Sequence, residues 1–365
     1  DPEEGLSLIT DPQDAVASSN GWHSIDGTLS FPDTKGNNAL SYSGPEPLTG
    51  TSEQTGPNSV FDYQWDPSKA PEDSSNKNAA VVNAFYVANK YHDVLYKYGF
   101  IEEAFNFQIN NFNKGGLGED GVLISVQDAS GKNNANFAAP PDGAPGICRM
   151  YTFTFTDPNR DGALENDIVT HELTHGLTNR MTGGGTSRCL QTLESGGMGE
   201  GWSDTVAFWS EQKSETPVDF TLGGYVTNKP DGIRSHPYST DMNVNPLMYA
   251  DLQELDEVHN IGEVWAMMLI EVYWALVTEY GFNAGITNVE SKEGNIVFLH
   301  LLVDALAIQP CNPTFVNARD AIIQADQYRY GGEHYCTVWR AFATRGLGFG
   351  AAEDHVNEYS VPPGC

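Results

Sequence analysis

The pattern of apolar residues changes at about residue 166, and this change limits the folds open to the chain. Before it, alternating and Gly-rich segments predict strands and long loops, with one helix at about residues 78–99. After it, apolar residues recur at helical spacing in six segments. Strands followed by helices predict an α+β protein. The six later helices are expected at residues 166–181, 198–212, 259–280, 293–308, 314–326 and 335–343.

We expect two lobes that divide at this change of pattern. Residues 1–165 would form a β-rich N-terminal lobe that includes the helix at about 78–99. Residues 166–365 would form a mainly helical C-terminal lobe. A chain of 365 residues is long enough for two lobes that share an interface.

The charge balance excludes whole classes of partner. The chain has 19 Lys and Arg against 49 Asp and Glu, a formal net charge of −30. A surface this acidic repels phosphate backbones and anionic lipids, so we expect no nucleic acid and no membrane as partner. The longest apolar helical stretch, residues 264–277, is interrupted by Glu271 and is too short to cross a bilayer.

Cysteine usage and the first residues favour an extracellular protein. The five cysteines are well separated and form no C-x-x-C pair, so we expect two disulfides and one free thiol, with the pairing left open. Five reduced core cysteines are the alternative. Asp1 to Glu4 contain no initiator Met and no signal sequence, which predicts cleavage upstream. The cysteines are Cys148, Cys189, Cys311, Cys336 and Cys365.

One helical segment carries a metal-binding pattern. Residues 171–175 read H-E-L-T-H, and His171 and His175 lie on the same helix face, where both imidazoles can bind one ion. Glu172 flanks that face and can point at a metal-activated water. The alternative is a core helix with two hydrogen-bonded histidines. The opposite face is apolar and can pack against a core; it carries Val169, Leu173, Leu177 and Met181.

The next predicted helix supplies a third ligand. Glu200 and Asp204 are four residues apart and share one face, opposite an apolar stripe that includes Trp202 and Val206. Two histidines and Glu200 would make a zinc site whose fourth tetrahedral position is open to water. Asp204 would then accept the remaining N–H of a ligand imidazole. For either carboxylate alone, an exposed helix edge is the alternative.

The stretch HELTHGLTNRMTGGGTSRCLQTLESGGMGEGWSD, at residues 171–204, resembles the zinc segment of the fungalysin family. These are secreted fungal zinc metalloendopeptidases related to thermolysin. The resemblance spans about residues 80–348 and is weak in the first 77 residues. It also rests on NNANFAAPPDG at 133–143, DEVHNIGEVWA at 256–266, CNPTFVNARDAIIQAD at 311–326 and CTVWRAFATRGLG at 336–348.

The resemblance implies a thermolysin-like, two-lobed metalloprotease with its active-site cleft, and its zinc, between the lobes. One zinc ion would be held by His171, His175 and Glu200, with Glu172 as general base and then general acid. The expected reaction is hydrolysis of internal peptide bonds of proteins. The family also implies secretion and a precursor whose own propeptide inhibits it before removal. We expect the mature protein to be a monomer.

Two further segments resemble substrate-binding parts of this family. His259 resembles the histidine that hydrogen-bonds the developing oxyanion, although it could simply begin a helix. Asn134, Ala135 and Asn136 lie in a segment that resembles the edge strand along which extended peptides pair, although an ordinary turn is the alternative. Thermolysin-like enzymes also place an oxyanion-donating tyrosine between the second histidine and the glutamate, but residues 176–199 contain no Tyr. Another donor would have to replace it, with residues 234–238 as one source.

The sequence leaves open a structural calcium site and two alternative functions. Asp167 and Glu211 lie at spacings that resemble the calcium-binding carboxylates of thermolysin, so a structural calcium is a second expectation. An aminopeptidase of the same zinc group would need a G-x-M-E-N-like segment to hold the substrate amine. A secreted binding protein with a vestigial zinc site is the third function, and the intact Glu172 argues against it.

Overall fold

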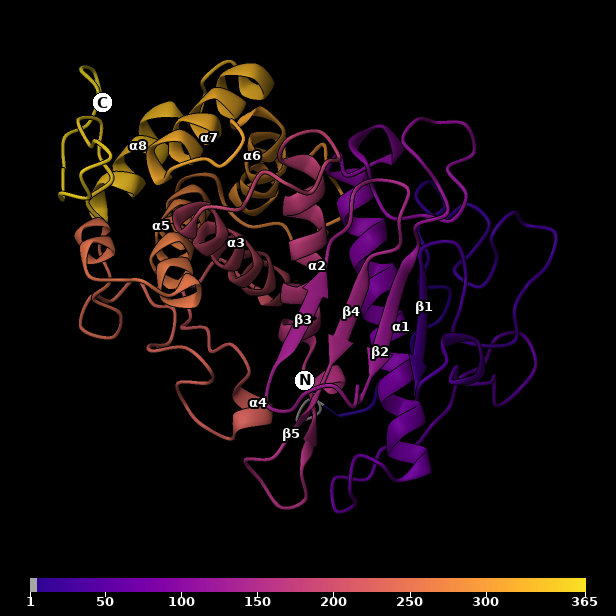
Figure 1. Cartoon of the computed structure of the whole chain (residues 1–365). Coiled ribbons are helices and arrows are strands. Elements are labelled where there is room, and N and C mark those ends of the chain that lie inside the picture. The colour runs from indigo at the N-terminus through magenta and orange to yellow at the C-terminus, as the bar shows by residue number, and fades with distance from the viewer. Residues whose placement is uncertain (1–4) are drawn as a thin grey trace. The chain divides into compact units, whose positions relative to one another are not determined.

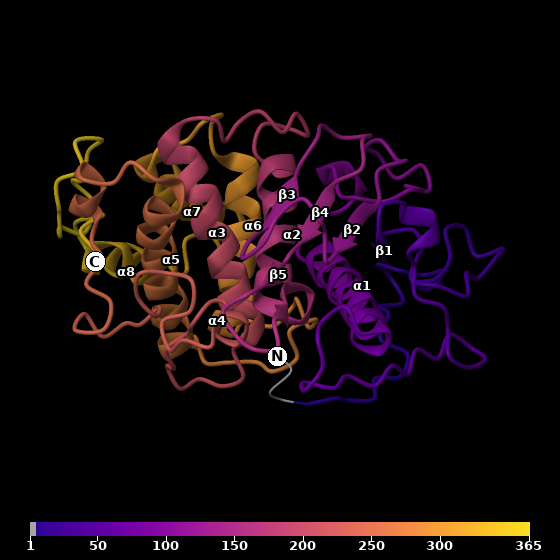
Figure 2. The same cartoon turned by 60° about the horizontal axis from the view of Figure 1, so that its bottom comes forward.

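The computed structural model describes residues 5–365 (Figures 1 and 2), so the processed start expected from Asp1 to Glu4 lies outside the described residues. Two compact units are present. The first contains the chain up to Arg180 together with Gly223–Ile233, and the second contains Met181–Leu222 and Arg234–Cys365. Eight helices and two small sheets among the described residues confirm the α+β class. The division into lobes at residue 165 stays a prediction, and the helix that follows it belongs to the first unit.

The first unit is built on a four-stranded sheet with strand order β1-β2-β4-β3. The strands β1, β2 and β4 are parallel, and β3 runs antiparallel to β4 at the end of the order. In residues 5–77, β1 is the one strand, and the rest is mostly turns and loops. The strands are β1 Ala39–Ser43, β2 Val122–Val126, β3 Ala135–Ala138 and β4 Ile147–Met150, with a second pair β5 Thr152–Phe153 and β6 Arg160–Asp161.

Two long helices of this unit coincide with predicted ones. Helix α1, Ser74–Lys97, begins where the Asp73 side chain accepts a hydrogen bond from Ser75 N, and it packs against β1 and β2 (Figure 1). Helix α2, Asn166–Met181, carries the H-E-L-T-H residues. A Cβ on Gly176 would lie 2.8 Å from the Phe107 ring, so this glycine lets α2 approach the aromatic core closely.

The C-terminal end of α2 is anchored by a buried arginine. The Arg180 side chain is fully buried, and its guanidinium donates to Asp120 Oδ2 at 2.9 Å, Ala144 O at 2.9 Å and Pro140 O at 2.8 Å. The same group stacks 4.0 Å from the centroid of the Phe107 ring. One side chain therefore ties the histidine-bearing helix to the loop that follows β3.

Replacing Arg180 with Met should lower the free energy of unfolding by about 3–5 kcal/mol, because the substitution leaves the buried Asp120 carboxylate without its cation. Burial already raises the pKa of Asp120, and Arg180 opposes that rise. Urea unfolding measures the change, with Arg188→Met, at an exposed position, as the control expected to stay within about 0.5 kcal/mol. A loss below about 1 kcal/mol at Arg180 would contradict the anchor.

The second unit is mainly helical and holds both disulfides. Cys189 pairs with Cys311 and Cys336 with Cys365, while Cys148 of the first unit is a buried free thiol. The prediction of two disulfides and one thiol is therefore confirmed. The helices of the second unit are α3 Leu193–Glu211, α5 Val258–Tyr280, α6 Gly294–Ile308, α7 Phe315–Tyr330 and α8 Tyr335–Thr344; the short α4, Gly224–Thr227, belongs to the first unit.

Helix α5 is the central helix of the second unit. It has the length and mean hydropathy of a membrane-spanning helix, but 83% of its most apolar window is buried within the structure. It packs against α3, α6 and α8, and Trp265, Tyr273 and Leu276 are fully buried. These contacts are those of a core helix, whose apolar residues are buried by neighbouring helices rather than by lipid.

Candidate metal centre

The histidine pair lies on one face of α2, as its spacing predicts. The two Nε2 atoms of His171 and His175 are 3.1 Å apart, and the rings meet edge to face with centroids 4.8 Å apart. His171 is buried and His175 is half-buried. On the opposite side of the helix, Val169 and Leu177 are completely buried, which fixes the rotation of α2 and thereby the direction of both imidazoles.

Glu200 lies in the second turn of α3. This helix begins at a capping box in which Thr192 and Ser195 exchange side-chain and backbone hydrogen bonds. Met198 and Trp202 are buried on its apolar side, and Glu200 itself is half-buried. Its position therefore follows from a defined helix start and a buried apolar stripe.

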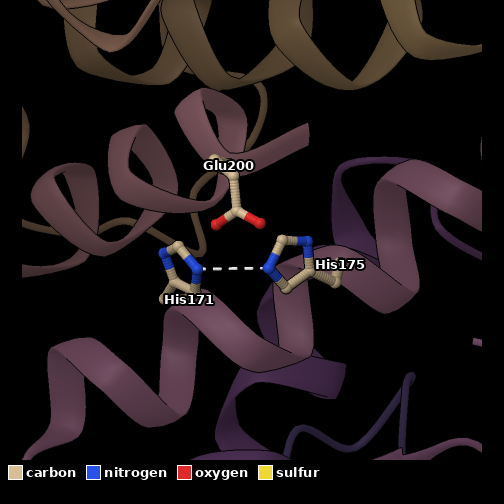
Figure 3. A group of neighbouring side chains, drawn as sticks. All are labelled: His171, His175 and Glu200. Atoms are coloured by element: carbon tan, nitrogen blue, oxygen red, sulfur yellow. Dashed lines mark hydrogen bonds between the residues drawn. The ribbon is translucent and has the colours of Figure 1, made fainter. Parts of the chain in front are cut away.

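The three predicted ligands form one group. His171, His175 and Glu200 each offer one ligand atom, and these atoms lie within 4.8 Å of one another. In Figure 3 the Glu200 carboxylate points toward the two imidazoles. Among residues 5–365, no other group of His, Cys, Asp and Glu meets this condition. Asp167 and Glu211, the expected calcium ligands, belong to no such group.

The donor set fits zinc. Two imidazole nitrogens and one carboxylate oxygen are the ligands of a catalytic zinc site with an open fourth position. With Zn–N bonds of about 2.0–2.1 Å, two ligands of a tetrahedral ion lie about 3.3 Å apart. The 3.1 Å between the Nε2 atoms of His171 and His175 is close to this value.

Glu172 is buried, with 4% of its surface exposed. It follows His171 on α2, and its negative charge acts on the thiol of Cys148 in β4: burial raises the pKa of Cys148, and Glu172 raises it further. The carboxylate is therefore near the β4 strand, which pairs with the edge strand β3. A buried carboxylate next to His171 on the same helix can accept a proton from a reacting group.

His259 and Glu200 lie close together within the second unit. His259 is in the first turn of α5, and its Nε2 lies 3.6 Å from Glu200 Oε2. Its Nδ1 lies 2.5 Å from Glu257 Oε1. Burial raises the pKa of Glu257, but hydrogen bonds from His259 and Asn260 outweigh it and lower the pKa overall. His259 therefore has a carboxylate oxygen near each of its two ring nitrogens, that of Glu257 at Nδ1 and that of Glu200 at Nε2.

Comparison with known proteins places this chain in a family. The model of the fungalysin metallopeptidases, family M36, matches residues 1–351. The chain belongs to this family. Among its relatives, extracellular metalloproteinase 3 of Trichophyton rubrum is 46% identical over 382 residues, which cover 100% of this chain and 59% of the relative. Extracellular metalloproteinase 3 of Trichophyton soudanense is 46% identical over 98% of this chain and 93% of its own length.

This fungalysin-family chain thus spans about three fifths of the T. rubrum relative, whose sequence continues beyond the match. A solved structure, the precursor of protealysin from Serratia proteamaculans, matches with a TM-score of 0.52 at 13% identity, over 85% of this chain and 86% of that one. The match confirms the expected thermolysin-like fold.

Asp204 of this fungalysin-family chain has hydrogen-bond partners that the sequence analysis did not predict. Arg234 Nε donates to Asp204 Oδ2 at 2.7 Å and Arg234 Nη2 to Oδ1 at 2.8 Å, which makes a two-pronged ion pair. The Tyr238 hydroxyl also donates to Asp204 and is buried. Whether Asp204 also accepts from a ligand imidazole stays a prediction. No local pattern links Arg234 to Asp204, which is 30 residues away along the chain.

The expected substrate-binding segment forms an edge strand. Ala135 and Asn136 lie in β3, whose other side has no partner in the sheet order of the described residues. Asn136 Nδ2 donates to the Tyr151 hydroxyl at 2.5 Å, and Arg149 donates to Asn136 Oδ1 at 3.2 Å. The Asn134 side chain accepts from Ala135 N at 2.9 Å. The side chains of both asparagines therefore form hydrogen bonds within the protein that stabilise β3 and the residue just before it.

Proposed function

We propose that the chain is an extracellular zinc endopeptidase that hydrolyses internal peptide bonds of proteins. The observation that carries the proposal is the group of His171, His175 and Glu200, whose ligand atoms lie within 4.8 Å of one another in a chain of the fungalysin family. The extracellular location is inferred from the names of the relatives.

In this proposal His171, His175 and Glu200 hold one zinc ion. When bound, zinc polarises the substrate carbonyl and makes water a stronger nucleophile at neutral pH. The Glu172 carboxylate accepts a proton from the attacking water and then donates it to the leaving amine. The Nε2–H of His259 donates a hydrogen bond to the oxygen of the tetrahedral intermediate, and the position of Nε2, 3.6 Å from Glu200 Oε2, supports that role because it places the ring beside the proposed ligand carboxylate.

The remaining roles are supported to different degrees. An extended substrate would pair with the free side of β3, beside Asn134, Ala135 and Asn136, because an edge strand offers unpaired backbone groups. Asp204 would orient a ligand histidine in addition to binding Arg234. Inhibition by the propeptide before its removal and a monomeric state belong to the proposal as implications of the family. Calcium at Asp167 and Glu211 has no support beyond their spacing.

Hydrolysis of casein tests the function directly. We expect the purified chain to cut casein at internal bonds, to lose the activity in a chelator such as 1,10-phenanthroline, and to regain it when zinc is added back. Release of single N-terminal residues without internal cuts would instead indicate an aminopeptidase. Stoichiometric zinc binding without hydrolysis of casein or short peptides would indicate a binding protein and overturn the proposal.

A further inference from the structure

Helices α3 and α5 of the second unit pack against each other (Figure 2). They approach each other through glycines at a point beside Glu200. A Cβ built on Gly262 would lie 2.6 Å from Glu200 Cβ and 2.9 Å from both Gly197 O and Gly201 N. Carbon atoms that pack in protein interiors are about 3.5–4.0 Å apart. At this helix separation, residue 262 therefore has to be glycine.

Both helices contribute to the close approach. A Cβ on Gly201 would lie 2.5 Å from Gly262 O, and a Cβ on Gly197 would lie 2.3 Å from Ile261 Cγ2. Gly197 and Gly201 are four residues apart and so lie on the same face of α3. We use the name glycine crossing for Gly197, Gly201 and Gly262.

Other glycines of α3 lie outside this contact. The nearest atom to a Cβ on Gly196 would be 3.6 Å away, and to one on Gly199 it would be 3.8 Å away, both ordinary contact distances. Glycine weakens a helix interior, so a glycine in α3 calls for a packing reason. The glycine crossing supplies that reason for residues 197 and 201 only, and it makes Gly196 and Gly199 matched controls.

We propose that the glycine crossing is a positioning element for the metal centre, an inference that rests on the proposed zinc function. Gly262 faces Glu200 Cβ directly, and His259 lies one turn earlier on α5 with its Nε2 3.6 Å from Glu200 Oε2. The separation of the two helices therefore sets both the ligand carboxylate and its distance to His259. Metal ligands must be held to within about 0.5 Å. A methyl group at residue 262 would push the helices apart by about 1 Å, since its contact with Glu200 Cβ falls that far short of normal packing.

The test compares Gly262→Ala with Gly199→Ala in the whole chain. Zinc affinity is measured by competition with a chelator dye, and ligand geometry by the visible spectrum of the Co²⁺-substituted protein. Thermal unfolding of the metal-free proteins measures stability separately. We expect Gly262→Ala to bind zinc about 10- to 100-fold more weakly, the range found when outer partners of metal sites are lost, and to change the Co²⁺ spectrum. Gly199→Ala should change zinc affinity less than about twofold, because its methyl group meets only ordinary contacts.

The possible outcomes distinguish a failure of the positioning role from a failure of the proposed zinc function. Equal zinc affinity and equal Co²⁺ spectra for Gly262→Ala and Gly199→Ala would overturn the positioning role, as would a loss of metal-free stability with an unchanged spectrum. Failure of the unsubstituted chain to bind zinc would overturn the proposed function instead. If Gly262→Ala does not fold, Gly197→Ala takes its place. A Cβ at residue 197 would lie 2.3 Å from Ile261 Cγ2 and 2.6 Å from Ile261 Cβ, and because Cβ is fixed to the backbone of α5, this substitution also pushes the two helices apart. The same loss of affinity is expected, and an unchanged affinity would again reject the inference.

Discussion

Replacing Glu172 with glutamine should reduce kcat on a peptide substrate by about 10²- to 10⁴-fold while leaving the zinc content at one ion per chain. Glutamine has nearly the same shape as glutamate but cannot accept the proton of the attacking water. Because Glu172 is not one of the three residues grouped as ligands, its replacement should not weaken metal binding. Steady-state kinetics measure the loss, and elemental analysis measures the metal.

A matched substitution at an exposed site controls for the general effect of removing one negative charge. Glu254→Gln lies on the surface of the second unit and should keep both turnover and zinc. A Glu172→Gln variant that retained near wild-type turnover would exclude Glu172 as the base. The reaction would then need another proton acceptor.

Replacing Glu200 with alanine should cost both metal and activity. Two histidines would remain of a three-residue ligand set, and we expect zinc affinity to fall by more than the roughly 100-fold that follows loss of an outer partner. His171→Ala should have the same effect. Zinc per chain after dialysis, together with hydrolysis of casein, measures both losses, and excess zinc should restore part of the activity of Glu200→Ala.

Glu194→Ala is the control on the same helix. Glu194 lies in the first turn of α3, where it accepts a hydrogen bond from Phe315 N at 2.7 Å and takes no part in the ligand group. It should keep one zinc per chain. One tightly bound zinc in the dialysed Glu200→Ala protein would show that a different residue completes the site.

The long helices were predictable because each buries a continuous apolar stripe. The segment expected at residues 259–280 is the helix Val258–Tyr280, and the segment expected at 166–181 is Asn166–Met181. The start of α3 was misplaced. It begins at Leu193 rather than at residue 198, because the capping box at Thr192 and the packing of Gly197 on α5 support a helical turn that glycine propensity alone disfavours.

The grouping of His171, His175 and Glu200 was predictable for a related reason: the two histidines share a local pattern, and Glu200 follows on the next helix. Contacts between distant segments were not predictable. The ion pair of Arg234 with Asp204 joins a loop to a helix 30 residues away, and nothing in either sequence marks the partner. The contact of His259 with Glu257, by comparison, is local, and its signal was a carboxylate two residues before the histidine.

The two cystine bridges are distributed unevenly. All four bonded cysteines belong to the second unit, which also holds Glu200, whereas the unit that carries the histidine helix has no covalent cross-link among its described residues. The bridge from Cys189 to Cys311 spans 122 positions, and closing a ring of that size removes about 4–5 kcal/mol of chain entropy from the denatured state. Synthesis in a reducing cytosol would forgo that contribution. The protein made there would lack this constraint in the unit that contains Glu200, and production under oxidising conditions is therefore expected to preserve the stability of that unit.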